Sequence, residues 1–220
     1  LPWRKLQKNN LPNPYFIFVS EFMLQQTTVN TVIKRFKEFI NLWPNIKKLS
    51  STSENKILSF WSGLGYYNRA KNLFKSSKII NSKYNKRIPK EYDILIKLPG
   101  IGDYTAKAIL GIGYNIPYMP VDANIERILA RLYGLKETRG KLKNKIYLLA
   151  QKFISNKNST NLIQSFMDYG SIICKPRNPN CRNCIIKLYC VSYKKNLQEI
   201  IPFKSKKPNR FCEECGAKLA

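Results

Sequence analysis

The sequence contains no histidine, and it has only 13 Asp and Glu against 39 Lys and Arg in 220 residues. Without histidine, Ser-His-Asp and Cys-His nucleophile systems, imidazole zinc sites and the zinc-deaminase pattern are excluded. Acid-base chemistry therefore falls to carboxylates, Lys, Tyr or Cys. Long apolar runs are also lacking, because Lys, Asn or Glu interrupts them every few residues, so no segment is predicted to span a membrane.

The scarcity of acidic residues leaves a formal net charge of +26. A surface this basic indicates a partner that is nucleic acid or an anionic membrane face. Hydrophobic residues make up 44% of the chain, which is enough to fill a core and argues against wholesale disorder.

Apolar residues recur with a helical period along most of the chain, and no segment alternates in the way that a strand requires. Between Pro89 and Leu110 the pattern predicts two helices interrupted at Pro99 and Gly100. The clearest single stripe, with charged residues on its opposite face, consists of Val29, Val32, Ile33, Phe36, Phe39 and Ile40. We therefore predict an all-α fold with short loops.

Four of the six cysteines lie close together, as Cys174, Cys181, Cys184 and Cys190, with the spacing C-x6-C-x2-C-x5-C. Four sulfur ligands suit either zinc or an iron-sulfur cluster. Structural zinc sites usually have two C-x2-C pairs, and only one is present, so the spacing favours a cluster over zinc or four unrelated thiols. Basic residues between the ligands favour a structural, phosphate-facing role. The remaining pair, Cys212 and Cys215, resembles half of a zinc ribbon and is interpreted as an incomplete or artificial terminus.

The stretch from Leu98 to Gly102 reads Leu-Pro-Gly-Ile-Gly and lies between two predicted helices. Gly100 and Gly102 allow backbone N–H groups to approach an anion, and the following helix N-terminus adds its dipole. This arrangement predicts a phosphate grip that does not depend on base sequence. The alternative is an ordinary turn between two helices, in which glycine is common.

Several motifs together carry a family resemblance. They are Leu1-Pro2-Trp3-Arg4, the run from Ser20 to Thr27 (SEFMLQQT), Gly63-Leu64-Gly65-Tyr66-Tyr67, Leu98 to Thr105, Val121-Asp122-Ala123-Asn124 and the four-cysteine loop. In this order they resemble the MutY family of adenine DNA glycosylases, which belongs to the helix-hairpin-helix glycosylases. The resemblance covers about residues 1–205.

The resemblance implies a two-lobed helical fold with a [4Fe-4S] cluster. A six-helix domain is expected over residues 17–120, with the helix-hairpin-helix motif at about 92–112. Residues 1–16 and 121–195 are expected to form the cluster domain, with the cluster loop at 174–190. Residues 196–220 are expected to be a basic linker or truncated tail, without the C-terminal domain that recognises 8-oxoguanine.

Two carboxylates are the candidates for catalysis. Cleavage of a glycosidic bond needs a proton donor for the leaving group and a negative charge near the sugar cation. Glu21 lies among apolar residues, where loss of hydration is expected to raise its pKa and keep it protonated. The resemblance implies that Glu21 protonates the adenine and later activates water, and that Asp122 faces the sugar. Their ordinary alternatives are an exposed carboxylate in a first helical turn for Glu21 and a helix N-cap for Asp122.

Tyr104 decides between two reaction types. By resemblance, relatives that also cut the DNA strand carry a lysine at this hairpin position and form a Schiff base with the sugar. Tyrosine there implies a monofunctional hydrolase. Lys107 lies about one helical turn further on and would need a shift of register to replace such a lysine, so only a weak lyase activity stays open.

Other positions match contacts that the family makes with DNA, which must expose the target base by flipping it out. Gln26 and Tyr66 match residues that wedge into the duplex, and Thr27 matches a contact to the opposite strand. The adenine pocket is matched by Trp3, Arg4, Leu24 and Gln164, and Asn124 belongs to the Asp122 motif. Core packing is the alternative for Trp3 and Tyr66, and an exposed helix position is the alternative for Gln164.

The sequence therefore predicts a monomeric, monofunctional glycosylase that removes adenine mispaired with 8-oxoguanine or guanine from double-stranded DNA. The DNA assignment removes the membrane alternative for the basic charge. One rival is a thymine mismatch or endonuclease III-like glycosylase, against which Glu21 together with Tyr104 argues. A rival of another class is a non-catalytic iron-sulfur module that only binds DNA.

Overall fold

The structure is a computed structural model that describes residues 1–137, 139–155 and 157–203. Cys212 and Cys215, and most of the predicted tail, lie outside the described residues. The helical elements are η1 (Pro2–Arg4), α1 (Pro14–Leu24), α2 (Val29–Leu42), α3 (Ile46–Ser50), α4 (Glu54–Phe60), α5 (Asn68–Lys83), α6 (Tyr92–Leu95), α7 (Asp103–Ala108), η2 (Ile109–Gly113), α8 (Ala123–Tyr133), α9 (Arg139–Gln151), α10 (Ser159–Ile172), η3 (Cys181–Asn183), η4 (Lys187–Tyr189) and α11 (Val191–Lys194).

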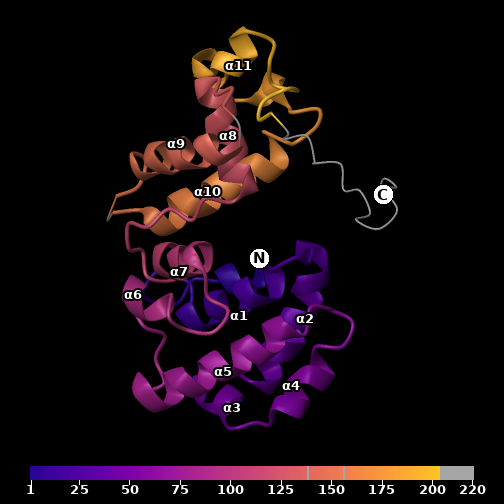
Figure 1. Cartoon of the computed structure of the whole chain (residues 1–220), viewed down its shortest axis with the longest axis vertical. Coiled ribbons are helices and arrows are strands. Elements are labelled where there is room, and N and C mark those ends of the chain that lie inside the picture. Colours follow the sequence, from indigo (N-terminus) through magenta and orange to yellow (C-terminus); the bar gives the residue numbers. More distant parts are fainter. Residues whose placement is uncertain (138, 156, 204–220) are drawn as a thin grey trace, which may run out of the picture. The chain divides into compact units, whose positions relative to one another are not determined.

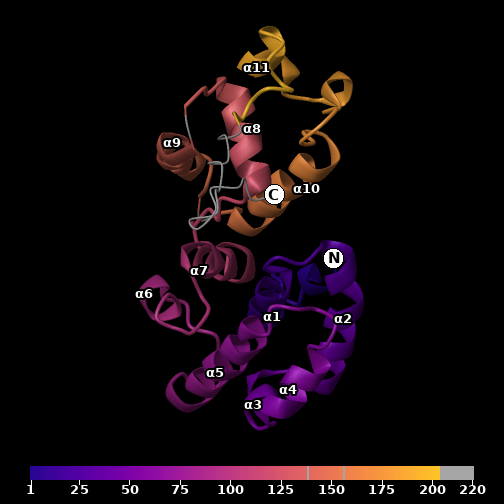
Figure 2. The same cartoon turned by 45° about the vertical axis from the view of Figure 1, so that its right-hand side comes forward.

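The prediction of an all-α fold is confirmed. Within the described ranges the chain forms no strand, and β pairing is limited to an isolated bridge between Leu6 and Pro12. Figures 1 and 2 show helices joined by short loops. None of the described helices is long and apolar enough to cross a membrane.

The chain divides into two compact units. Among the described residues, unit 1 contains Leu1–Asp122 and Ala150–Asp168, and unit 2 contains Ala123–Leu149 and residues 169–203. The boundary after Asp122 lies close to the predicted one near residue 120, whereas the segments 1–16 and 150–168 join unit 1 and not the predicted cluster domain.

Specific contacts explain this difference in the two segments. The ring of Trp3 packs edge-on against Phe36 of α2, with ring centroids 5.3 Å apart. From α10, the hydroxyl of Thr160 donates to the backbone carbonyls of Gly111 and Ile112 at 3.2 and 3.0 Å. Both segments thus complete the packing of unit 1 from sequence positions far from their partners.

Helix α1 forms the centre of unit 1. It begins with Pro14 at its first position, and the side chain of the N-cap Asn13 accepts a hydrogen bond from the Tyr15 amide at 2.9 Å. It is apolar on nearly every face, which is the pattern of a helix surrounded by other elements. Five of its apolar side chains are at most 1% exposed: Ile17, Phe18, Val19, Phe22 and Met23. Helices α2, α5, α7 and the η2 turn pack against it.

The outer helices of unit 1 follow the predicted periodicity, except that Val29, in the first turn of α2, is 42% exposed. Val32, Phe36 and Phe39 of α2 face inward, while Lys34, Arg35 and Lys37 lie on its more exposed side. Ser53 is the N-cap of helix α4, and its side chain accepts from the Lys56 amide at 3.4 Å. Helices α3 and α4 both pack on α5 (Figure 1).

Unit 2 is organised around α8, against which α11 packs. Two arginines on α8, Arg127 and Arg131, are only 6% and 3% exposed. Their guanidinium groups donate to backbone carbonyls around the cysteine segment, namely those of Gly170, Cys174, Lys175, Pro176 and Ile201. Buried charges of this kind require such partners, so the loop is tied to α8 by its own backbone.

Candidate active site and cysteine loop

Glu21 lies in the last turn of α1 and is 7% exposed. Burial, together with the negative charge of Asp122, raises its pKa from an ordinary value of 4.5 to about 8, against a smaller opposing effect of Arg4. The carboxyl is therefore protonated at neutral pH and able to donate a proton. The raised pKa that the apolar neighbours of Glu21 predict agrees with the structure. The alternative, an exposed carboxylate in a first helical turn, does not agree with it.

Asp122 and Tyr104 lie within electrostatic reach of Glu21. Asp122 directly precedes α8, and Tyr104 lies in the first turn of α7. Burial raises the pKa of Tyr104 well above 10, and the charges of Glu21 and Asp122 add to this effect, while Arg4 opposes it. Tyr104 is therefore a neutral phenol throughout the physiological range, and two acidic side chains share one region with it.

The N-terminal turn η1 brings Arg4 into the same region. Its guanidinium donates to the carboxylate of Asp168 on α10 at 2.7 Å and contacts the sulfur of Met167 at 3.8 Å. Trp3 is only 3% exposed and its ring packs on Phe36, so it has a core contact beside its predicted place in the adenine pocket. Leu24, which ends α1, is partly exposed.

Two loops near the end of α1 expose the predicted wedge residues. Gln26 is exposed with a φ of +59°, and Tyr66 is 62% exposed with a φ of +49°. Thr27 is partly exposed and accepts a hydrogen bond from Arg69 at 2.9 Å. Between the loops lies an open groove of about 370 Å³, lined by Gln25, Gln26, Tyr66, Tyr67, Asn68 and Arg69. A side-chain amide of Gln25 also donates to the Gly100 carbonyl at 3.3 Å.

The predicted hairpin joins α6 to α7. Gly100 has a φ of +77°, and a Cβ there would lie 2.7 Å from the Asn72 Cβ and 2.8 Å from a ring carbon of Phe22, so only glycine fits. Gly102 is the N-cap of α7, is exposed, and leaves open space where a Cβ would be. Its position lets an anion approach the amides that begin α7.

Lys107 has a defined place in the hairpin. It is 6% exposed, and its ammonium group lies 2.6 Å from the carboxylate of Asp103. The Tyr92 hydroxyl donates to the same carboxylate oxygen at 2.7 Å. This ion pair holds Lys107 in the packing of α6 against α7, which argues against its use as a Schiff-base lysine.

The two remaining predicted contacts lie on α8 and α10. The side-chain oxygen of Asn124 accepts from Arg127 at 2.8 Å, and the Asn124 side chain leaves room only for glycine at Gly170. Asn124 thus has a structural partner within unit 2. Gln164 is partly exposed on the part of α10 that belongs to unit 1.

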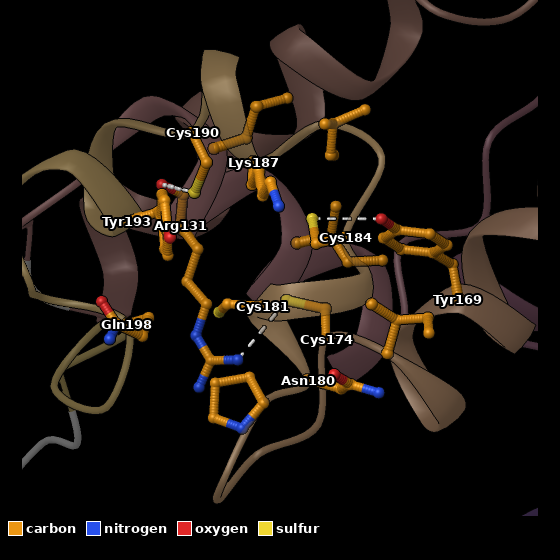
Figure 3. A pocket seen from close by; sticks show the side chains of 15 residues that line it. Arg131, Tyr169, Cys174, Asn180, Cys181, Cys184, Lys187, Cys190, Tyr193 and Gln198 are labelled. Atoms are coloured by element: carbon orange, nitrogen blue, oxygen red, sulfur yellow. Dashed lines mark hydrogen bonds between the residues drawn. The ribbon is translucent and has the colours of Figure 1, made fainter.

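All four cysteines of the predicted cluster line one cavity in unit 2, with Arg131 and Tyr169 beside them (Figure 3). A guanidinium nitrogen of Arg131 lies 3.4 Å from the Cys174 sulfur, and the Tyr169 hydroxyl lies 3.1 Å from the Cys184 sulfur. Burial raises the pKa of Cys181, and the neighbouring cysteines raise it further. Burial also raises the pKa of Cys190, so ionisation of these two thiols is unfavourable unless a cation compensates the charge.

The chemistry of the donor set fits an iron-sulfur centre. Four soft sulfur donors share one cavity, and the Arg131 and Tyr169 donors point at sulfur atoms, as suits thiolates. This fit rests on the type and number of the donors, because across residues 1–137, 139–155 and 157–203 no three or more Cys, Asp or Glu side chains are already arranged as a metal site.

Several residues with evident roles were missed at the level of sequence. Asp168 pairs with Arg4 across 164 positions, and Tyr169 and Arg131 contact the cysteines. Arg69 binds both wedge loops, and it lies two residues after the Gly63–Tyr67 motif. The position of Arg69 close to a recognised motif could have indicated a role for it. Nothing in the local sequence indicates that Arg4 pairs with Asp168.

The sequence matches the family described as HhH-GPD superfamily base excision DNA repair protein over residues 19–155. The chain belongs to this superfamily. The matched range begins in α1, before Glu21, and includes the hairpin and Asp122. Superfamily membership therefore rests on the part of the chain that holds the two carboxylates.

The predicted resemblance to the MutY family is confirmed by curated relatives. The chain is 40% identical over 209 residues to an adenine DNA glycosylase of Buchnera aphidicola subsp. Schizaphis graminum, a match that covers 94% of the chain and 59% of the relative. It is 33% identical to the mouse adenine DNA glycosylase, over 89% of the chain and 39% of the relative. The chain thus spans between about two fifths and three fifths of these curated relatives.

Solved structures of this superfamily share the fold. A thermostable thymine-DNA glycosylase has a TM-score of 0.77 and 27% identity, over 89% of this chain and 88% of that one. A non-covalent endonuclease III–DNA complex has a TM-score of 0.72 and 24% identity, over 84% and 86% of the two chains, which shows the fold alone.

Proposed function

We propose that this chain carries the catalytic part of an adenine DNA glycosylase of base excision repair. The observation that carries the proposal is the buried Glu21 carboxyl, whose pKa of about 8 keeps it protonated beside Asp122. The names of the 40% and 33% identical relatives support adenine as the base released.

The proposed reaction is hydrolysis of the N-glycosidic bond. The Glu21 carboxyl donates its proton to a ring nitrogen of adenine, and the bond between the base and the sugar carbon breaks with its electron pair leaving on the base. The negative charge of Asp122 stabilises the sugar cation. Glu21, now a carboxylate, removes a proton from water, whose oxygen bonds to the sugar carbon. The products are free adenine and an abasic site, and Glu21 ends protonated.

A monofunctional enzyme is proposed because no lysine amine is available at the hairpin position. Tyr104 is a neutral phenol there, and the Lys107 amine is buried and paired with Asp103. Without a Schiff base, the sugar is not linked to the protein and the strand is not cut.

DNA binding is proposed to combine the hairpin with the two wedge loops. The open N-cap at Gly102 supplies amides for a backbone phosphate, and the excess of Lys and Arg attracts the duplex. The exposed Gln26 and Tyr66 fill the space that the flipped adenine leaves, and Thr27 contacts the opposite strand. The partner is a duplex that contains adenine opposite 8-oxoguanine or guanine, bound by one copy of the chain.

The remaining sites complete the proposal. By resemblance, Trp3, Arg4, Leu24 and Gln164 are proposed to line the adenine pocket, and Asn124 belongs to the motif that carries Asp122. Cys174, Cys181, Cys184 and Cys190 would hold a [4Fe-4S] cluster, which would order their loop as a structural element. Elemental analysis of anaerobically purified protein should find iron, and zinc without iron would contradict the cluster.

A thymine mismatch glycosylase is the rival function, favoured by the TM-score of 0.77 to such an enzyme. Duplexes with adenine opposite 8-oxoguanine, adenine opposite guanine, and thymine opposite guanine decide between them. We expect release of adenine, with strand breakage only after alkali. Release of thymine in its place would overturn the substrate assignment. Absence of any base release would favour a DNA-binding module without catalysis.

A further inference from the structure

Gln26 and Tyr66 adopt backbone conformations that residues with side chains rarely use. Both have a left-handed φ, of +59° and +49°, and both side chains are exposed. This conformation is unfavourable for residues other than glycine and persists only where surrounding interactions enforce it. Both loops must therefore contain interactions that hold the left-handed conformation of Gln26 and Tyr66.

One side chain, Arg69 near the start of α5, binds both loops. Its guanidinium donates to the carbonyls of Met23 at 2.7 Å and Gln25, and to the Thr27 hydroxyl at 2.9 Å, on the first loop. It donates to the carbonyls of Leu64 at 3.0 Å and Gly65 at 3.2 Å on the second. These acceptors flank Gln26 on both sides and directly precede Tyr66.

The same guanidinium also lies near two rings. Its central carbon is 5.6 Å from the centre of the Tyr66 ring and 5.6 Å from that of the fully buried Trp61. A cation at this distance attracts an aromatic face. Arg69 is thus bound to the core through Trp61, to the Tyr66 side chain, and to the backbone of both loops. Its own exposed fraction is 6%.

We propose that Arg69 is a positioning residue that fixes the two wedge side chains, Gln26 and Tyr66, at one separation, so that both enter the same step of the duplex. This inference rests on the proposed function. The two terminal nitrogens of the planar guanidinium point in different directions. Nη1 donates to carbonyls of the first loop. Nη2 donates to Thr27 of the first loop and to the carbonyls of Leu64 and Gly65 in the second loop. A lysine has a single nitrogen and does not span the same acceptors.

The test compares Arg69→Lys and Arg69→Met with the wild-type chain. The single-turnover rate of adenine release should fall by at least about tenfold in Arg69→Met, since small misplacements of positioning groups reduce rates this much. Arg69→Lys should fall less but measurably. Affinity for a fully paired duplex should change less than about threefold, because the hairpin phosphate contacts are retained.

A second readout reports the wedge directly. In a duplex with 2-aminopurine in place of the target adenine, fluorescence rises when the base leaves the stack. Both Arg69 variants should give a smaller rise at saturating protein. If Arg69→Met does not fold, Arg69→Lys alone decides, and a normal rate with a normal fluorescence rise in that variant would overturn the proposal.

Ile80→Ala is the matched control, because Ile80 lies on the same helix, is 0% exposed, and is about three turns from Arg69. It should lower the melting temperature while leaving the fluorescence rise and the rate per folded molecule unchanged. Equal losses in Ile80→Ala and the Arg69 variants would show that Arg69 acts only through stability and would refute the proposal.

Hydrogen exchange separates this inference from the proposed function. Amides at 25–27 and 64–66 should exchange faster together in the Arg69 variants, with little change in the rest of α1, whichever base the protein releases. If wild type releases no adenine but the two loops still loosen together, the proposed function fails and the coupling stands. If only one loop loosens, the coupling fails.

Discussion

The carboxylate site in unit 1 and the cysteine loop in unit 2 are built in different ways. Glu21 lies on an eleven-residue helix between Phe18 and Phe22, both 0% exposed. The loop has only three-residue helical turns, and Ile185 and Tyr189 within it are 84% and 78% exposed. Packing therefore fixes the carboxylate, whereas few apolar contacts fix the loop. What orders the loop is its hydrogen bonds to arginine and tyrosine, and whatever its thiols bind.

The largest expected effect is on the carboxylate side. Glu21→Gln should lower the rate of adenine release by about 10³-fold, because the amide is too weak an acid to protonate the base. Since Gln has nearly the same shape, the melting temperature of unit 1 at pH 5 should stay close to that of wild type. Glu38→Gln is the control, because Glu38 is an exposed partner of Arg35, and its rate should stay within about twofold. Retained activity in Glu21→Gln would show that the buried carboxyl of unit 1 is not the catalytic acid.

Removal of metal should affect the cysteine loop alone. After anaerobic chelation, amides at 174–190 should exchange at least about 100-fold faster, because their order depends on bound thiols. Amides at 17–23 in α1 should change little, because a hydrophobic core protects them. Mass spectrometry of exchanged peptides measures both in one sample. Equal loss of protection in both segments would show that the two regions do not differ in this way.

Stability should depend on pH through Glu21. Its pKa is about 8 when folded and near 4.5 when unfolded, so its contribution is complete below pH 4.5 and is lost as pH rises to about 8. Across this window the free energy of unfolding of wild type should fall relative to Glu21→Gln by up to about 1.4 kcal/mol per pH unit. Denaturant titrations at several pH values measure this slope. Parallel curves for the two proteins would mean that Glu21 is not buried as an acid.

The hairpin provides a smaller test of packing in unit 1. Gly100→Ala should lower the free energy of unfolding by about 3 kcal/mol, because its φ is left-handed and its Cβ would meet Asn72 and Phe22. Gly102→Ala is the matched control, since a Cβ there meets nothing within 4 Å, and it should change stability by about 0.5 kcal/mol or less. Similar losses in both variants would contradict the packing at Gly100.

The smallest expected effect concerns one hydrogen-bonding group of the loop. Tyr169→Phe removes a hydroxyl that donates to the Cys184 sulfur and accepts from the Ile185 amide at 3.1 Å. We expect amides at 184–186 to exchange about tenfold faster, a local cost of about 1.4 kcal/mol. Tyr133→Phe, on the exposed side of α8, should leave them unchanged. No difference between the two variants would mean that the hydroxyl does not order the loop.

The sequence predicted those features that depend on neighbouring residues. The face of α2 follows from its apolar period, and the raised pKa of Glu21 follows from the apolar residues on both sides of it. The cysteine spacing indicated a shared cavity because the loop is too short to separate its members. Each of these predictions needs only a few consecutive turns of chain.

Features that depend on tertiary contacts were not predictable from one sequence. The segment 150–168 joins unit 1 because of contacts such as those of Thr160 with Gly111, and nothing local in either stretch indicates the pairing. Arg69 looks like any other basic residue of α5 until the two loops fold around it. The site roles assigned by resemblance to Trp3, Gln164 and Asn124 stay predictions.

The hydrogen bond from Gln25 to the Gly100 carbonyl joins the loop that would probe the base stack to the hairpin that would hold the backbone. A protein moving along a duplex would therefore carry its probe at a constant offset from its grip. The phosphate that the hairpin binds would then determine which base pair the wedge residues contact.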